Sequence, residues 1–365
     1  MARVAEEPAN SDRSDWQGDA AGCNAPALAA VPTIGGAPVR RLMGVQVLAT
    51  GSYVPDCVVD NEELATLGYD AEWILQRTGI RERRILPSEL ATSDMAVAAA
   101  RRCLARAEVS PADVDLLIVA TFTPDVPVPS VACMVQRQLG LSAPAMDLQA
   151  ACAGFVYAMA TAAQFVAAGT ARRALVVGAD CNSRILNRQD MKIYPLFGDG
   201  AGAVLLGPGA TDQGLESYTL GADGTGAELL IRPMGGTRLA CTPEGLAANL
   251  QFLRMDGRAV FKWAIRILDE TIRAVLDSAG LTIADLDLFV LHQANIRILD
   301  AAAEQLGIDR QKMFVNLDRY GNTSAGSIPL ALDEAFVAGR IRPGDRVLVS
   351  GFGAGLTWGT VILRW

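Results

Sequence analysis

The amino-acid sequence predicts a layered α/β fold made of two similar halves. Apolar, strand-like runs alternate with helical patterns along most of the chain, which is typical of a mostly parallel sheet covered by helices. The runs also recur at a fixed spacing: Val176 and Val349 lie 173 residues apart in ALVVGAD and VLVSGFG, and Leu116 and Leu288 lie 172 apart. Such a repeat predicts duplicated βα halves around a shared core, and a chain of 365 residues has room for both.

Composition narrows the class of protein. The net charge of −8 and the isoelectric point near 4.9 argue against nucleic acid as a partner, because no basic stripe is available to neutralise phosphates. The seven cysteines are odd in number and scattered, so neither a disulfide framework nor a metal site is indicated. These features predict a cytoplasmic protein with reduced thiols.

The chain divides into three predicted regions. Residues 1–43 mix small and acidic residues without an apolar period, which predicts a disordered extension rather than a secretory signal. Structure is expected to begin near Gly44, with a first half over 44–215 and a second over 216–365.

Elements of the first half can be placed by their patterns and caps. Asp60 and Asp70 can cap short helices, and Ser93 can cap a helix over 95–107. Further along, the patterns predict a strand from Gly44, a buried strand over 115–121, a helix over 129–139, and strands over 173–179 and 203–206.

The second half is predicted in the same way. Its elements are a helix over 257–279, a strand over 286–293, a helix over 296–307, a strand over 313–317, a helix over 325–339, and strands over 346–350 and 359–364. The glycine-rich segment 197–203 leads into a strand, whereas a dinucleotide-binding loop leads into a helix, so nucleotide binding is disfavoured.

The stretch 146–169 is the most informative part of the chain. A short strand runs into a long uncharged helix, and Cys152 lies at the join among small residues. A thiol on the first turn of a helix is expected to favour the thiolate, which makes Cys152 a candidate nucleophile. The alternatives are a cysteine that serves only as a small core residue and a membrane-spanning run, the latter disfavoured by Gln149 and Gln164.

Two polar residues of the second half complete a candidate catalytic set. His292, the only histidine in the chain, ends the strand over 286–293, where α/β sheets place functional groups. Asn322 lies in the turn that the repeat makes equivalent to the Cys152 turn. The pseudo-twofold implied by the repeat would bring Cys152, His292 and Asn322 together.

Six further motifs occur in a fixed order along the chain: TGIRER (78–83), AACAGF (150–155), FGDGAGA (197–203), HQANIRI (292–298), GNTSAGS (321–327) and GFGAGLTWG (351–359). Together they resemble the β-ketoacyl-acyl carrier protein synthase III family, which has a thiolase-like fold with a layered αβαβα core. The resemblance runs from about Gly44 to Trp365. It implies decarboxylative Claisen condensation of an acyl starter with malonyl-acyl carrier protein, with no tightly bound cofactor.

The resemblance also implies roles for the three residues. Cys152 matches the residue that takes the acyl group from acyl-CoA, and His292 and Asn322 match the pair that stabilises the enolate left by decarboxylation. The backbone N–H groups of Cys152 and Ala354 match the oxyanion hole for attack on the thioester.

Binding residues follow from the same resemblance. Trp73 and Arg77 match residues that hold the CoA nucleotide, and Asn295 matches one on the pantetheine arm. Lys262 and Arg297 match basic residues that meet the acidic carrier protein. A homodimer without membrane or nucleic-acid partners is expected.

Departures from the family pattern bear on the substrate. Met191 replaces an arginine that packs on adenine, which leaves open whether the donor rides on CoA or on a carrier protein. Glu304 and Gln305 stand at two basic docking positions, and Val128 replaces a bulky residue that closes the acyl pocket from the partner subunit. These departures favour a specialised pathway, such as starter-unit selection for a polyketide or lipid.

Two other functions remain open at this stage. The first transfers the acyl group from Cys152 to an alcohol or amine without condensation, for which Asn322 would have no carbanion to stabilise. The second is a catalytically silent partner of another synthase, against which the presence of Cys152, His292 and Asn322 argues.

Overall fold

The computed structural model describes residues 38–365, and the structural statements below refer to these residues. The first of two five-stranded sheets has the order β2-β8-β7-β5-β6. Its strands are β2 (Val45–Tyr53), β8 (Gly200–Pro208), β7 (Ala174–Asp180), β5 (Leu116–Ala120) and β6 (Ala145–Leu148). Pairs β5/β6 and β5/β7 are parallel, and β2/β8 and β7/β8 are antiparallel. Every residue of β5 and β7 is buried, as expected for central strands covered on both faces.

The second sheet repeats this arrangement, in the order β1-β9-β14-β13-β12. Its strands are β1 (Arg40–Met43), β9 (Gly214–Ala222), β14 (Thr357–Arg364), β13 (Arg346–Gly353) and β12 (Leu288–Leu291). Strands β12 and β13 are parallel and the other pairs antiparallel. The order β9-β14-β13-β12 therefore matches β2-β8-β7-β5, and the predicted duplication is confirmed.

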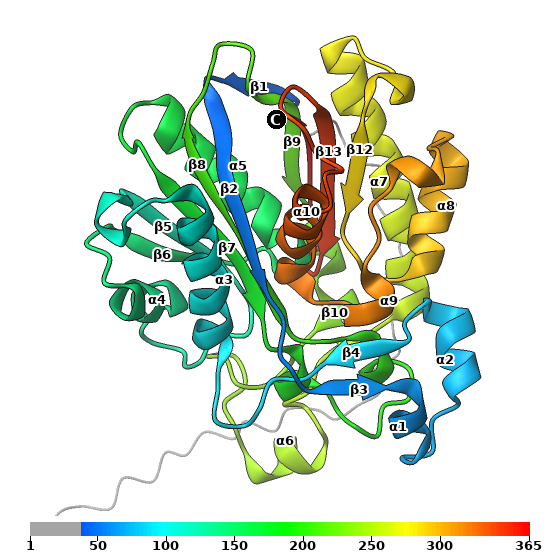
Figure 1. Cartoon of the computed structure of the whole chain (residues 1–365). Helices are drawn as coiled ribbons and strands as arrows, with labels where there is room; N and C mark the ends of the chain where they lie inside the picture. Colours follow the sequence, from blue (N-terminus) through cyan, green and yellow to red (C-terminus); the bar gives the residue numbers. More distant parts are fainter. Residues whose placement is uncertain (1–37) are drawn as a thin grey trace, which may run out of the picture. The chain divides into compact units, whose positions relative to one another are not determined.

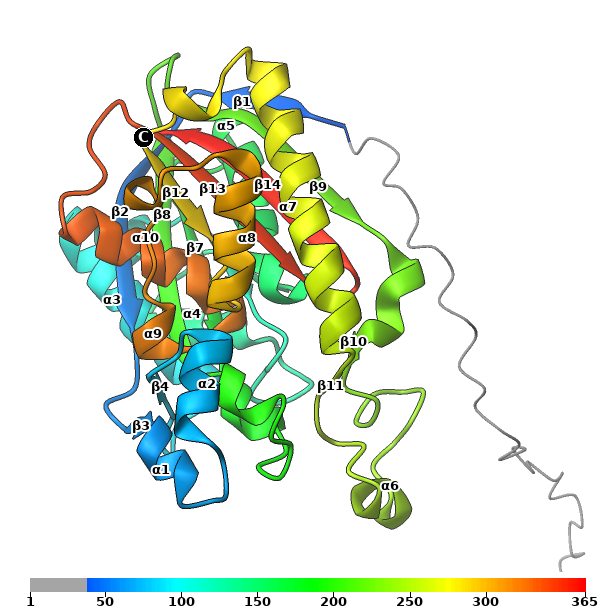
Figure 2. The same cartoon turned by 90° about the vertical axis from the view of Figure 1, so that its right-hand side faces the viewer.

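Helices form three layers around the two sheets (Figures 1 and 2). Helices α5 (Gly154–Ala167) and α10 (Ser327–Val337) lie between the sheets and share one apolar core with strands of both. Helices α3 (Thr92–Ala107) and α4 (Val131–Leu139) cover the outer face of the first sheet. Helices α7 (Gly257–Ala279) and α8 (Ile296–Leu306) cover the second. The result is the predicted αβαβα core.

Shorter elements gather at one end of these layers, where the central strands β5, β7 and β12 have their carboxyl ends (Figure 1). They are β3 (Val58–Asp60), α1 (Asn61–Ala65), α2 (Ala71–Thr78), β4 (Glu82–Arg84), β10 (Leu230–Ile231), α6 (Pro243–Ala247), β11 (Arg254–Met255) and α9 (Leu317–Tyr320). Several of them share a second apolar cluster, which includes Ile74, Ile193 and Phe197. This cluster supports the walls of the cavity described below.

Most predicted elements are present, with small changes of bounds. Asp60 and Asp70 cap α1 and α2 as predicted, their carboxylates accepting from the N–H groups of Glu63 and Trp73. Helix α7 has the predicted bounds. Ser93, by contrast, lies inside α3, which begins at Thr92, and the carboxylate of Asp125 accepts from the Ser93 N–H.

The strand predicted over 313–317 is wrong. Only Met313 makes a bridge, to Phe289 of β12, and α9 begins at Leu317. The side chain of Gln293 takes the place of a strand partner, since its amide donates to the Phe314 carbonyl and accepts from the Asn316 N–H. The segment expected to be an edge strand is therefore held by the side chain of Gln293 instead of by a ladder of backbone hydrogen bonds.

The start and division of the chain also differ from the expectation. Residues 40–43 belong to the predicted disordered extension, but they form β1, which pairs with β9. Residues 1–37 of that extension lie outside the described residues. The predicted boundary after residue 215 falls inside β9, a strand that the sequence patterns did not reveal.

Candidate active site

Cys152 lies in a tight strand-to-helix turn between β6 and α5. One turn of 3₁₀-helix, Ala151–Ala153, separates the strand from the helix, so Cys152 precedes α5 by two residues rather than lying on its first turn. Ala151 has a φ of 47°, in the left-handed region that few residues other than glycine adopt. Ser324, 173 residues later, has a φ of 52° in the equivalent turn before α10. The two halves thus repeat the same bend.

A cavity of about 810 Å³ opens onto this turn. Cys152, His292 and Asn322 all line it, although they come from three different segments of the chain. The cavity also takes in four of the predicted binding residues, namely Trp73, Arg77, Asn295 and Arg297. The predicted convergence of the two halves is therefore observed.

His292 is held rigidly at the end of β12. Its backbone N–H donates to the Ser350 carbonyl, its Nδ1 lies 2.7 Å from the Ser327 hydroxyl, and its ring packs edge-on against Phe352 with centroids 5.2 Å apart. Burial lowers the pKa of His292 to about 3, because the imidazolium would lose its hydration. The imidazole is therefore neutral at physiological pH.

Cys152 rests as a thiol. Burial raises the pKa of Cys152 to about 12, and the nearby negative charge of Asp180 adds to this shift, while a hydrogen bond with Ser324 opposes it. The sequence predicts that the helix terminus favours the thiolate, whereas burial acts in the opposite direction and favours the thiol. The thiol and the imidazole are thus both neutral before substrate binds.

Asn322 is oriented by its own turn. Its backbone N–H donates to the Leu196 carbonyl, and its carbonyl accepts from the Gly198 N–H. Its side-chain oxygen accepts from the Ser324 N–H at 2.8 Å, which leaves the NH₂ group as the end available to the cavity. Gly198, in the glycine-rich segment, can approach the Asn322 backbone closely only because it has no side chain. A Cβ at this position would lie 2.2 Å from the Tyr320 carbonyl oxygen.

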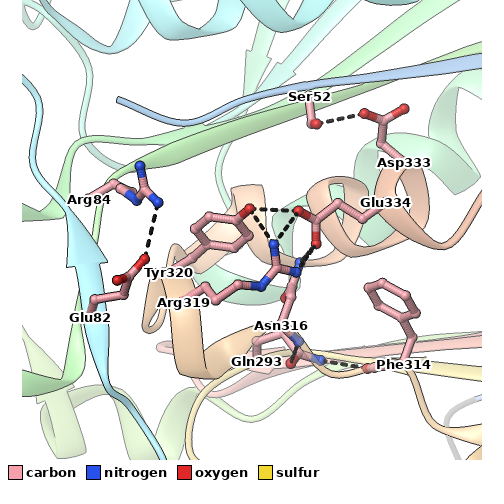
Figure 3. A network of polar contacts seen from close by, with 10 residues as sticks. All are labelled: Ser52, Glu82, Arg84, Gln293, Phe314, Asn316, Arg319, Tyr320, Asp333 and Glu334. Atoms are coloured by element: carbon pink, nitrogen blue, oxygen red, sulfur yellow. Dashed lines mark hydrogen bonds and ion pairs between the residues drawn. The ribbon is translucent and has the colours of Figure 1, made fainter. Parts of the chain in front are cut away.

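A polar network holds α9, the helix that leads into the Asn322 turn (Figure 3). The carboxylate of Glu334 on α10 accepts from Arg319, from the Tyr320 hydroxyl at 2.6 Å and from the Asn316 amide at 2.9 Å. Asn316 is in turn bonded to Gln293, which follows His292. Glu334 and Gln293 were not found from the sequence, because only the folded chain brings these side chains together.

The second predicted oxyanion donor lies in the loop after β13. Ala354 is partly buried and does not line the cavity, whereas Gly353 does. A Cβ at Gly353 would lie 2.6 Å from the Cys152 nitrogen. The glycine therefore keeps space open beside the Cys152 N–H.

The walls toward the solvent carry basic and aromatic side chains. The Arg77 guanidinium lies 5.9 Å from the Trp73 ring centroid, and that of Arg297 lies 5.6 Å from Phe261. The side-chain oxygen of Asn295 caps α8 by accepting from the Arg297 N–H. Lys192 and Arg258 also line the cavity. Neither was singled out from the sequence, where isolated basic residues carry no pattern.

The remaining predicted residues lie outside the cavity lining. Lys262 is exposed on α7, one residue after Phe261, which does line the cavity. Met191 is 48% exposed beside Lys192, and Val128 is 83% exposed. Glu304 and Gln305 are exposed near the end of α8. Within residues 38–365, no helix combines the length and apolar character needed to cross a bilayer.

Comparisons with known proteins agree with this arrangement. The family model for 3-oxoacyl-[acyl-carrier-protein] synthase III matches residues 146–224, and the model for its C-terminal part matches residues 276–365. A β-ketoacyl-[acyl-carrier-protein] synthase III from Rhodopirellula baltica is 52% identical over 343 residues, which cover 89% of this chain and 99% of that protein.

Solved structures of similar proteins have the same fold. The 3-oxoacyl-[acyl-carrier-protein] synthase III of Aquifex aeolicus is 41% identical with a TM-score of 0.81, over 88% of this chain and all of that one. The priming β-ketosynthase of a polyketide pathway is 37% identical with a TM-score of 0.82, over 90% of this chain and 98% of that one. With the site geometry, these matches establish that the chain is an acyl-transferring condensing enzyme of the β-ketoacyl-acyl carrier protein synthase III family.

Proposed function

We propose that the chain condenses a Cys152-bound acyl starter with malonyl-acyl carrier protein, and so initiates fatty-acid or polyketide-type chains. The observation that carries this proposal is the convergence of Cys152, His292 and Asn322 on one cavity. The Cys152 sulfur attacks the starter thioester and loses its proton as the donor thiol leaves. The malonyl unit then loses CO₂, and its enolate carbon forms the new C–C bond while the C–S bond to Cys152 breaks.

The two polar residues suit the enolate step. Decarboxylation places negative charge on the thioester oxygen, which N–H donors stabilise without taking up a proton fully. The Asn322 NH₂ group is available, because the amide oxygen is used by Ser324. If the Ser327 hydroxyl donates to Nδ1 of His292, the imidazole proton lies on Nε2, which supplies the second donor. A carboxylate at either position would repel the enolate.

The oxyanion of the first step is assigned to the backbone N–H groups of Cys152 and Ala354. The open space beside the Cys152 nitrogen, kept by Gly353, supports the first assignment. The assignment of Ala354 rests on its place in the glycine-rich loop. Preorganised backbone donors of this kind are typically worth about 10²- to 10³-fold in rate each.

The substrate arms are proposed to enter past the basic and aromatic walls. Trp73 and Arg77 would hold the nucleotide of an acyl-CoA and Asn295 the pantetheine arm, with Arg297 and Lys262 meeting the carrier protein. Met191 stands where the family has an arginine that packs on the adenine of CoA. An acyl-carrier protein is therefore the second proposed source of the acyl group. The similarity to a polyketide priming synthase supports a specialised pathway.

The enzyme is also proposed to be a homodimer and to be located in the cytoplasm. Val128, exposed on the single chain, would meet the partner subunit of a homodimer and border the acyl pocket. The half over 44–215 would supply the nucleophile and the half over 216–365 the His/Asn pair. The acidic composition and scattered cysteines support a cytoplasmic enzyme without a tightly bound cofactor.

Intact-protein mass spectrometry tests the mechanism. The protein is incubated with acyl-CoA and acyl-carrier donors of different lengths, then with malonyl carrier protein. A mass increment on Cys152 that disappears with CO₂ release supports condensation. An increment that persists until an alcohol or amine is added would make the enzyme a simple acyltransferase.

Two variants separate the roles of the residues. Cys152→Ala abolishes acyl-enzyme formation, because the nucleophile is absent. Asn322→Ala spares acylation but lowers decarboxylation by about 10²-fold or more, because the enolate loses one donor. Equal loss of acylation in both variants would contradict this division of roles.

A further inference from the structure

Asp180 is a completely buried carboxylate to which the mechanism above gives no part. It ends β7 and is held by N–H and O–H donors. Its Oδ1 accepts from the Thr121 hydroxyl at 2.9 Å, from the Phe122 N–H at 3.0 Å and from the N–H and hydroxyl of Thr123 at 3.2 and 2.8 Å. Its Oδ2 accepts from the Ala325 N–H at 3.0 Å.

The internal repeat relates the hydrogen bond between Asp180 and Ala325 to the Cys152 turn. Ala325 lies 173 residues after Cys152 and is its counterpart in the second turn. The corresponding strand glycines face these two turns, more closely in one half than in the other: a Cβ at Gly178 would lie 2.2 Å from the Ala325 carbonyl oxygen, and one at Gly351 would lie 3.3 Å from that of Cys152. Gly178 and Gly351 are themselves 173 residues apart.

Two residues further along each strand, the halves differ. On β13 the position is Gly353, where a Cβ would lie 2.6 Å from the Cys152 nitrogen, and the absent side chain leaves that N–H open. On β7 the equivalent position is Asp180, whose carboxylate accepts a hydrogen bond from the Ala325 N–H, the counterpart of the Cys152 N–H. The second turn therefore carries a built-in anion at the place where the first turn can receive a substrate oxygen.

The filled turn is connected to Asn322. The Ser324 N–H, next to Ala325, donates to the Asn322 side-chain oxygen, and the Ser324 hydroxyl donates to Asn182 at 2.9 Å. The Asn182 amide donates in turn to the Gly198 carbonyl, and Gly198 bonds the Asn322 backbone. When Asp180 holds Ala325 in place, it also holds the neighbouring Ser324 N–H, which orients the side-chain amide of Asn322.

We propose that Asp180 is a positioning residue for the decarboxylation step: by filling the second turn's anion site it holds Ala325 and Ser324, and through them orients Asn322 toward the enolate. This inference rests on the proposed condensation. It assigns to Asp180 no contact with substrate, and it predicts that the two half-reactions respond differently when the carboxylate is changed.

Asp180→Asn tests the proposal with little change of shape. The amide oxygen is expected to face the four donors on the Oδ1 side, which turns the NH₂ group against the Ala325 N–H and removes that one bond. We expect malonyl decarboxylation to fall by about tenfold to hundredfold, the range for a misplaced catalytic group. Acylation of Cys152 should change by less than about threefold, because the Ser324 hydroxyl that bonds the Cys152 thiol keeps its own hydrogen bond with Asn182.

A second readout distinguishes positioning from general damage. Asp180 is the negative charge near Cys152, so its neutralisation favours the thiolate and should raise the rate of Cys152 alkylation by iodoacetamide at pH 7, followed by peptide mass spectrometry. A purely structural role would instead lower both half-reactions together. Equal losses in both, or no loss of decarboxylation, would overturn the proposal.

Matched variants keep the test decisive. Asp333→Asn changes another buried carboxylate, one that bonds Thr50, Ser52 and Arg106, and it should not separate the two half-reactions. If Asp180→Asn does not fold, Thr121→Val removes one donor to Oδ1 and keeps the charge; it should lower decarboxylation a few-fold without faster alkylation. Failure of the wild-type enzyme to acylate Cys152 or release CO₂ would refute the proposed function instead.

Discussion

At the scale of single residues, burial decides the protonation of the site. Cys152 and His292 are 6% and 1% exposed, and burial moves the pKa of each away from neutrality in the direction of the uncharged form. Burial therefore favours a neutral thiol and a neutral imidazole in the cavity over a thiolate–imidazolium pair. In the proposed mechanism, a neutral His292 whose proton lies on Nε2 would donate a hydrogen bond to the enolate without transferring that proton fully.

The titration of His292 can be observed directly, because it is the only histidine of the sequence. In tag-free protein, the imidazole nitrogen resonances should show a neutral ring from pH 8 down to about pH 5, since burial lowers the pKa to about 3. The unfolded chain binds this proton at a pKa of about 6.5, so the contribution of His292 to the free energy of unfolding should fall by about 1.4 kcal/mol per pH unit as the pH drops below that value. Asp180 acts in the opposite direction, because burial raises its pKa to about 6.

His292→Gln provides the comparison, since glutamine does not titrate. Its free energy of unfolding should depend less on pH between about 6 and 4 than that of the wild type, the slopes being measured by urea denaturation. A His292 resonance that titrates near pH 6.5 would show that the ring is solvated in solution.

At the scale of elements, the central helix α10 is tied to the first sheet by one carboxylate. Asp333 accepts from the Thr50 hydroxyl at 2.7 Å and the Ser52 hydroxyl at 2.6 Å on β2, and it pairs with Arg106 on α3. Figure 3 shows the contact between Ser52 and Asp333. Three layers of the fold therefore meet at a side chain that is 6% exposed.

Asp333→Ala should lower the free energy of unfolding by about 2 kcal/mol or more. The buried Thr50 O–H loses its acceptor, although the oxygen still accepts from Arg106, and an unsatisfied buried donor typically costs about 1–3 kcal/mol. Chemical denaturation measures this loss. Asp300→Ala removes a surface pair with Arg310 and serves as the control, with little change in midpoint. Similar midpoints for both variants would contradict the bridging role of Asp333.

The sequence predicts most elements, and its failures have physical causes. Helix α7 and the caps at Asp60 and Asp70 could be predicted, because each depends only on residues that are close together in the sequence. Strands β1 and β9 pair with each other and were missed, because β9 mixes polar and apolar residues and β1 is short. The segment 313–317 fails because the side chain of Gln293, distant in sequence, replaces a backbone partner.

The candidate site divides in the same way. Cys152, His292 and Asn322 could be identified because the repeat and the motifs point to turns that the fold brings together. Asp180 could not, because its contact with Ala325 spans 145 residues and depends on side-chain geometry. The effect of burial on the pKa of Cys152 could not be predicted either, because a helix terminus is visible in the sequence, whereas the degree of burial is not.

At the scale of the whole molecule, the exposed Val128 bears on assembly. It is 83% exposed on the single chain, and it lies in the loop between β5 and α4. An apolar side chain in this position suits contact with a second copy. The proposed homodimer would place it at the partner's acyl pocket.

Val128→Phe should shift acyl preference toward shorter chains, because added bulk fills space that a long or branched acyl group needs. We expect a change of about tenfold or more in the ratio of acylation rates for long and short donors. Val337→Phe, at the exposed end of α10, is the control. A dimer by analytical ultracentrifugation whose preference is unchanged by Val128→Phe would contradict the pocket assignment.

The duplicated turns also determine how many acyl groups the enzyme can carry. A fold with two equivalent bends could hold two covalent intermediates, but the second bend has Ala325 where the first has Cys152, and the Asp180 carboxylate occupies the neighbouring N–H. Each chain can therefore be charged at this site only once. In the proposed mechanism, the first half would carry the acyl starter on Cys152, and the second half, without a nucleophile in its turn, would serve only to activate the malonyl unit.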